Sequence, residues 1–182
     1  MVGSDQLGSE WKKQHVIQGS HAVSDDPEVV LMTILGSCVA TCLWDERRGI
    51  GGMNHFLLPE ESSGDSEVRL YGAHAMELLI NDLMKRGAKK ERLKGKLFGG
   101  ASMIEGLSAV GARNATFAKK FLEREGIPCI AESLGGKRAR RIRFWPVQGK
   151  AQQLFVAEAP GLLKAEVPPS VRPKDVGEVS LF

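Results

Sequence analysis

The sequence predicts an α+β fold, in which a mixed sheet or β-sandwich core carries two main helices. Apolar, β-branched stretches come first, two segments of helical periodicity follow with a short strand between them, and further strand-like stretches come after the second helix. This order of strands, helix, strand, helix and strands favours an α+β fold or a mixed α/β sandwich.

The first strands are predicted at residues 29–35, 39–44 and 50–58. The first of these is a continuous apolar run rich in β-branched residues, which is typical of a buried strand. Gly36 and Ser37 interrupt the run, the polar segment 45–49 forms a turn, and Pro59 ends the third strand. The last two of these strands are therefore predicted to form a hairpin.

Two helices are predicted at residues 70–86 and 114–125. In both segments apolar residues recur every three or four positions, which places them on one helical face. Gly87 ends the first helix, and Asn114 is predicted to cap the start of the second, which ends at residues 126–128. Additional strands are predicted at 96–98, 130–131, 141–145 and 154–157.

The chain of 182 residues suits one domain. We expect a flexible polar arm at residues 1–14, a folded domain at 15–158, and a Pro-rich tail at 159–182. The composition, 42% hydrophobic and 26% charged, is that of an ordinary soluble protein. No signal peptide or membrane-spanning stretch is apparent, so we expect a cytoplasmic protein with no membrane insertion.

The three cysteines favour reduced thiols over a disulfide framework. Cys38 and Cys42 share one face of a predicted strand but lie about 13 Å apart at about 3.3 Å per residue, so both cannot bind one zinc ion. We therefore expect no metal site and no cofactor. Cys42 and Cys129 are predicted to be core thiols, and His74 a surface side chain.

The candidate catalytic pair is Cys38 and His55, which lie 17 residues apart on either side of the predicted hairpin. A histidine within hydrogen-bond reach of a cysteine can act as the base that activates the thiol. If Trp44 pairs with Ile50, Cys38 falls opposite Phe56, and a shift of one residue places it opposite His55. Spacing alone leaves two interpretations open, an active site and a packed hairpin with an ordinary cysteine.

Gly36 and Ser37 bear on the same question. Small residues before a nucleophile leave room for substrate and free backbone N–H groups that can stabilise an oxyanion. The other interpretation is a β-bulge or bend followed by a buried cysteine.

One basic cluster covers residues 137–145. It is interpreted first as a solvated strand face, because Arg141 and Arg143 alternate with Ile142 and Phe144. Its functional alternative is binding of an acidic protein, which fits better than RNA because a net charge of +3 is too small to indicate nucleic acid. We therefore expect no nucleic-acid partner.

Several motifs in series resemble the chemoreceptor glutamine deamidase family, CheD. The resemblance covers roughly residues 15–157, in order and with the expected separations. Its motifs are the segments 33–39 (TILGSCV), 53–59 (MNHFLLP), 97–101 (LFGGA), 113–117 (RNATF), 125–128 (EGIP) and 134–136 (LGG). Ala139 stands where the family leads us to expect a glycine.

The resemblance implies a cysteine hydrolase of bacterial chemotaxis, a protein-glutamine glutaminase. It implies Cys38 as nucleophile, His55 as base and Thr33 as a third catalytic residue. The substrate would be a glutamine of a methyl-accepting chemotaxis receptor, with glutamate and ammonia as products, and glutamyl methyl esters would follow the same route. The resemblance also allows an alternative, a regulatory binding module that docks on receptors or on a CheC-type phosphatase of phosphorylated CheY.

Overall fold

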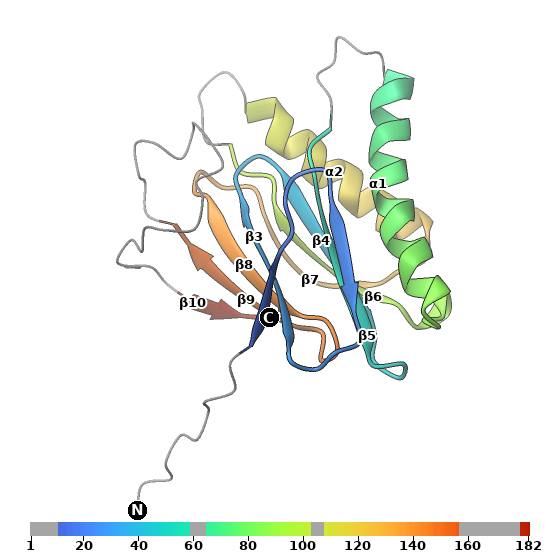
Figure 1. Cartoon of the computed structure of the whole chain (residues 1–182). Coiled ribbons are helices and arrows are strands. Elements are labelled where there is room, and N and C mark those ends of the chain that lie inside the picture. The colour runs from blue at the N-terminus through green and yellow to red at the C-terminus, as the bar shows by residue number, and fades with distance from the viewer. Residues whose placement is uncertain (1–10, 59–64, 103–107, 157–178) are drawn as a thin grey trace, which may run out of the picture.

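The computed structural model describes residues 11–58, 65–102, 108–156 and 179–182. Within these residues, two five-stranded sheets pack face to face and two α-helices cover the outer face of one of them (Figure 1). The molecule therefore has a helix layer and two sheet layers, which confirms the predicted α+β class with a β-sandwich core.

The sheet farther from the helices, here called sheet A, contains strands from both ends of the described chain. Its order is β1 (Lys12–His15), β3 (Val29–Leu35), β8 (Arg140–Trp145), β9 (Lys150–Phe155) and β10 (Val179–Leu181). β1 runs parallel to β3 and the other neighbours are antiparallel, so the sheet is mixed.

The sheet that carries the helices, here called sheet B, is also mixed. Its order is β2 (His21–Ser24), β5 (Ile50–Phe56), β4 (Val39–Asp45), β6 (Lys94–Gly99) and β7 (Cys129–Leu134). β6 and β7 are parallel, and β4 lies at the centre between two antiparallel partners. The predicted hairpin is thus β4–β5.

Both helices pack on sheet B. α1 (Asp65–Lys85) lies against β2 and β5, and α2 (Ser108–Arg124) lies against β4, β6 and β7 (Figure 1). A short 3₁₀ turn, η2 (Lys90–Arg92), leads from α1 to β6. The apolar helix faces anticipated from the sequence cover the sheet, with Met76, Leu79 and Leu83 from α1 and Phe121 and Leu122 from α2 all buried.

β4 separates the two hydrophobic cores of the molecule. All seven of its residues are buried, with Val39 and Leu43 packed toward the helices and Ala40 and Cys42 packed toward sheet A. This alternation follows from the two-residue period of a strand. A residue placed just before β4 therefore lies beside the interior of the sandwich.

Three short strands were not anticipated. β1 and β10 are edge strands of sheet A, and β2 is an edge strand of sheet B. β1 falls within and beside the predicted arm (1–14), and its four residues are polar and exposed. β10 falls within the predicted tail (159–182), of which residues 159–178 lie outside the described part. These strands have only three or four residues, too few for a clear periodic pattern in the sequence.

Lys96 connects the C-terminal strand to the rest of the sandwich. Its side chain is almost fully buried, and its Nζ donates hydrogen bonds to the carbonyl oxygens of Gly149 (2.8 Å) and Phe182 (2.7 Å). The Phe182 ring packs edge-on against Phe98. Burial lowers the pKa of Lys96, and the two carbonyl groups compensate its charge.

Among the helices in the described residues, none has a stretch that is both long enough and apolar enough to cross a lipid bilayer.

Candidate active site

The register of the β4–β5 hairpin determines where His55 lies. The ladder closes with Asp45 opposite Ile50, one residue later than the predicted pairing through Trp44. The Asp45 carboxylate accepts hydrogen bonds from backbone N–H groups of the turn, which extends the ladder by one pair. As a result, His55 lies opposite Ala40 and not directly opposite the cysteine.

Cys38 and His55 nevertheless lie on the same side of sheet B. Ala40 and Cys42 face the core between the sheets, and Cys38, two residues earlier, packs against the same core. His55 shares its side with Met53, which belongs to that core as well. Diagonal positions on neighbouring strands are about 7–8 Å apart, which an imidazole can span.

Gly36, Ser37 and Cys38 connect β3 to β4, and we call these three residues the nucleophile loop. The loop is held by its carbonyl groups, all three of which accept a hydrogen bond. The donors are Ala101 N–H to Gly36 O (2.8 Å), Asn114 Nδ2–H to Ser37 O (2.8 Å) and Gly100 N–H to Cys38 O (2.7 Å). Within the described residues, the backbone N–H groups of Ser37 and Cys38 donate to no other residue, and the Cys38 N–H lies beside its own thiol. Two free donors beside a thiol are suited to stabilise an oxyanion.

The close approach of β6 to the nucleophile loop requires two glycines. Gly99 and Gly100 have φ angles of +114° and +66°, a region that favours glycine. A side chain at Gly99 would collide with the Cys38 carbonyl group. The LFGGA motif therefore holds the backbone of the candidate nucleophile Cys38 in place.

Thr33 reaches His55 across the space between the two sheets. Its Oγ1 lies 2.9 Å from His55 Nδ1, and the hydroxyl donates its own proton to the Val16 carbonyl oxygen at 2.8 Å. Thr33 Oγ1 must then accept from Nδ1, and the same nitrogen lies 3.3 Å from Val16 O, another acceptor. Both contacts assign the proton of neutral His55 to Nδ1.

The other imidazole nitrogen is consequently the one with a free lone pair. His55 Nε2 is buried and has no hydrogen-bond partner in the described part of the chain. An unpaired buried nitrogen is uncommon in a folded protein and is expected where a reactant must bind. This nitrogen is available as a proton acceptor, and His55 lies on the same face of sheet B as Cys38.

The thiol and the imidazole are both neutral at rest. Burial raises the pKa of Cys38 to about 11, against a smaller opposing effect of its own backbone N–H. Burial also lowers the pKa of His55, with Val16 O opposing the change. Within the described residues, Cys38 Sγ donates to Gln18 Oε1 at 3.4 Å rather than to His55. The structure therefore brings Thr33 and His55 into direct contact, and Cys38 to the same face without a hydrogen bond to either.

Asn114 has a different role from the predicted helix cap. α2 begins at Ser108, so Asn114 lies within the helix, fully buried. Its Oδ1 accepts from Leu58 N–H at 3.0 Å while its Nδ2 donates to Ser37 O. One side chain thus joins the nucleophile loop to the segment that follows β5. The sequence feature that could have indicated this bridging role is an asparagine within a segment of otherwise helical periodicity.

The remaining cysteines and histidines lie apart from this site. Cys42 is fully buried, as expected, but Cys129 is exposed at the start of β7, because that strand lies at the edge of sheet B. His74 is exposed on α1, as predicted. In the residues that the structure describes, no group of three or more His, Cys, Asp or Glu side chains is placed to hold a metal ion.

The basic cluster divides between the interior and the surface. Ile142 and Phe144 are fully buried and Arg143 is exposed, as the alternation predicts. Arg140 was not expected in the core, yet its exposed fraction is only 1%. Its guanidinium donates to the carbonyl oxygens of Ser133 and Gly135 and so fixes the end of β7 beside the LFGGA motif.

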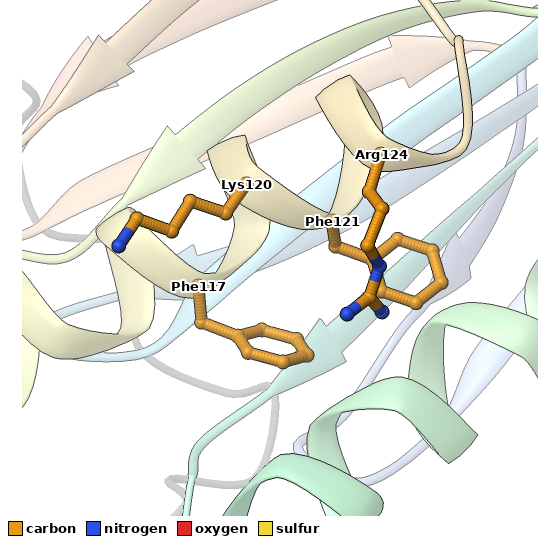
Figure 2. A pocket seen from close by; sticks show the side chains of 4 residues that line it. All are labelled: Phe117, Lys120, Phe121 and Arg124. Carbon is orange, nitrogen blue, oxygen red and sulfur yellow. The ribbon is translucent and has the colours of Figure 1, made fainter.

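A groove also lies along α2 (Figure 2). Phe117 and Phe121 provide an apolar floor, and Lys120 and Arg124 are exposed along it. The Arg124 guanidinium lies over the Phe121 ring, 5.7 Å from its centre. The groove combines apolar area with positive charge.

Comparisons with known proteins agree with the motifs of the site. Residues 57–153 match the family described as CheD chemotactic sensory transduction. The "Probable chemoreceptor glutamine deamidase CheD" of Caulobacter vibrioides is 52% identical over 174 residues, covering 93% of each chain. The protein of the same name from Acidiphilium cryptum is 52% identical over 180 residues, covering 94% of each chain.

A solved structure, that of Bacillus licheniformis hypothetical protein YfiH, overlaps 62% of this chain and 49% of its own at 15% identity, with a TM-score of 0.42. An overlap of this size carries no argument about function, whereas the sequence matches extend over almost the whole chain. This chain belongs to the CheD family.

Proposed function

We propose that this protein is a cysteine hydrolase that converts glutamine side chains of methyl-accepting chemotaxis receptors to glutamate. The observation that carries the proposal is the His55 imidazole: Thr33 holds its proton at Nδ1, and its Nε2 has no partner among the described residues. The imidazole lies on the same face of sheet B as Cys38. The printed names of the CheD relatives point to the same reaction.

In the first half of the reaction, Cys38 Sγ attacks the carboxamide carbon of the substrate. The thiol proton passes to His55 Nε2, and the electron pair of the C=O bond moves to the oxygen, which the Ser37 and Cys38 N–H groups hold. His55 then returns the proton to the nitrogen as the C–N bond breaks. Ammonia leaves and a thioester remains on Cys38.

In the second half, water cleaves the thioester. His55 Nε2 takes a proton from the water as it attacks, and the proton returns to the leaving Cys38 sulfur. Glutamate is released and the thiol is restored. Thr33 keeps the imidazole in one tautomer throughout, and Gly36 supplies room and an anchoring carbonyl for the nucleophile loop.

The same thioester would form from a glutamyl methyl ester, with methanol in place of ammonia as the leaving group. We therefore include hydrolysis of receptor methyl esters as a second activity of the same site. The receptor segments that carry these side chains are cytoplasmic helices, so the protein acts in the cytoplasm.

A second candidate function is that of a regulatory binding module. The groove on α2 favours it, because its apolar floor and its cationic edge suit an acidic amphipathic segment of a partner. A CheC-type phosphatase is the partner that the family resemblance suggests. This function uses the surface of α2 and has no need of the thiol.

The deciding experiment incubates the full-length protein with a receptor cytoplasmic fragment and measures ammonia release and the Gln-to-Glu mass change. We expect the wild-type protein to be active and Cys38→Ala to be inactive with an unchanged melting temperature. Cys129→Ala is the matched control, because this thiol is exposed on β7 away from the nucleophile loop. Full activity of Cys38→Ala would refute the proposal, and an inactive wild type that binds a CheC-type protein would favour the binding module.

A further inference from the structure

The resting thiol has a partner that the proposed mechanism does not use. Cys38 Sγ donates to the side-chain oxygen of Gln18 at 3.4 Å. Gln18 is exposed while Cys38 is half-buried. The contact therefore lies on the side of the thiol that is open to solvent, from which a receptor helix must approach.

The connection between β1 and β2, which carries Gln18, is fixed to the catalytic residues on both sides of it. The hydrogen bonds are Thr33 Oγ1–H to Val16 O (2.8 Å), Gly19 N–H to His55 O (2.7 Å) and His55 N–H to Ser20 O (3.0 Å). Gly19 has a φ of +82°, which lets the chain turn directly after Gln18. Gln18 is thus held at the thiol by backbone contacts to the same two residues that form the base.

The carboxamide of Gln18 suits this position because it can both accept and donate a hydrogen bond. While the thiol is protonated, Gln18 Oε1 accepts from Sγ–H. Once the proton has moved to His55, negative charge lies on the substrate oxygen, and an acceptor beside it is unfavourable. A half-turn of the amide brings Nε2–H to the position that Oε1 held.

We propose that Gln18 is a further catalytic residue of this reaction, an inference that rests on the proposed function. Its Oε1 orients the thiol at rest, and its Nε2–H joins the Ser37 and Cys38 N–H groups in holding the oxyanion. Gln18 neither gains nor loses a covalent bond or a proton. Its contribution is the charge stabilisation of one additional donor.

The test compares Gln18→Ala and Gln18→Glu with the wild type on the receptor fragment, with kcat and KM determined separately. Gln148→Ala is the matched control, an exposed glutamine in the β8–β9 turn at the opposite end of the sandwich. We expect kcat of Gln18→Ala to fall by about 10²–10³-fold with little change in KM, as for other single oxyanion donors. Gln18→Glu has the same shape but only accepts, so its kcat should fall at least as far, with an unchanged melting temperature.

The outcomes separate this inference from the proposed function. An active wild type with an equally active Gln18→Ala overturns the role of Gln18 alone, whereas an inactive wild type overturns both. A change in KM only would make Gln18 a receptor contact and would overturn the role as donor. Conversion of Gln18 itself to glutamate, dependent on Cys38 and detected by peptide mass spectrometry, would make it a substrate and would also overturn the proposal.

Discussion

At the scale of single residues, burial determines the direction in which the pKa values of Cys38 and His55 shift. The pKa of the thiol is raised to about 11 and the pKa of the imidazole is lowered from 6.5. Neutral thiol and neutral imidazole are thus the resting forms at pH 7. In the proposed mechanism the proton therefore moves during the attack on substrate, and no thiolate has to form beforehand.

This ionisation sets the expected pH dependence. Because only the neutral imidazole accepts a proton, kcat/KM should be constant around neutral pH and fall on the acid side, with its midpoint below the ordinary histidine value of 6.5.

Alkylation of Cys38 by iodoacetamide should be slow at neutral pH and rise steeply as the pH approaches the thiol pKa of about 11. Mass spectrometry of the labelled peptide measures the alkylation rate. A rate that levels off near neutral pH would contradict a thiol and an imidazole that are both neutral at rest.

The tautomer of His55 gives a second prediction at this scale. Thr33→Val keeps the shape of the side chain but removes the acceptor for Nδ1–H, so kcat should fall by roughly 10–100-fold, as for other partners that orient a functional histidine. Thr33→Ser restores the hydroxyl and should recover most of the rate. Comparable losses in both variants would show that packing of the methyl group matters more than the hydrogen bond.

Sequence alone could predict Cys38, His55 and Thr33 as candidates, since motif resemblance marks them. It could not predict Gln18, because a polar residue in a short connection carries no periodic signal. The contact of Gln18 with Cys38 also depends on the path of the β1–β2 connection, which passes from sheet A to sheet B. The hairpin register was predicted one residue away from the observed one, because the side-chain hydrogen bonds of Asp45 lengthen the ladder.

At the scale of elements, α2 supports the nucleophile loop. Its apolar face was predicted from helical spacing, but its start was placed at Asn114, six residues after the observed start at Ser108. The residue type that commonly caps a helix is here buried and bonded to two other segments. Such tertiary hydrogen bonds override the preference of asparagine for helix caps, and they cannot be recognised from the spacing of apolar residues.

The Asn114 bridge can be tested directly. Asn114→Ala leaves Ser37 O and Leu58 N–H without partners, and at about 1–3 kcal/mol for each buried group the free energy of unfolding should fall by about 2–6 kcal/mol. Asn114→Asp still accepts from Leu58 but faces Ser37 O with a second acceptor, so kcat/KM should fall as the loop is released. Urea unfolding and ammonia release measure the two effects.

The control for the bridge is Asn81→Ala, an asparagine exposed on α1. A substitution on an exposed helix surface is expected to change stability by no more than about 0.5 kcal/mol. If Asn114→Ala and Asn81→Ala had equal stability, the two hydrogen bonds of Asn114 would contribute nothing to the fold.

At the scale of the whole molecule, Asp45 joins the hairpin turn to the segment before β6. Its side chain is fully buried, and burial by itself raises its pKa, but hydrogen bonds from Arg92 and from the backbone of Lys89 and Arg48 outweigh this and lower the pKa to about 2. The ionised form is therefore stabilised in the folded state.

The consequence is a loss of stability in acid. Because the folded pKa lies below the ordinary value of 3.8, this contribution is complete above pH 3.8 and disappears as the pH falls through about 2, a loss of about 2 kcal/mol. Asp45→Asn should unfold more easily than the wild type near neutral pH, and the difference should shrink toward pH 2. A constant difference in urea unfolding across this range would argue against the depressed pKa.

The fold class was predictable because the long buried segments carry strong patterns. The pairing of distant strands was not, since β1 and β10 are short edge strands whose sequences carry little periodic pattern. The burial of Lys96 was not predictable for the same reason, because its side chain is covered in part by the segment that follows β10.

The hydrogen bond from Thr33 to His55 has a consequence for the growing chain on the ribosome. Thr33, Cys38 and His55 all lie within the first 55 residues, yet Thr33 belongs to sheet A, whose β3 borders β8 at residues 140–145. A nascent chain that ends before β8 contains these three candidate residues but leaves one side of β3 without its partner strand. We therefore expect the contact between Thr33 and His55 to form only after β8 has been synthesised and sheet A has closed around β3.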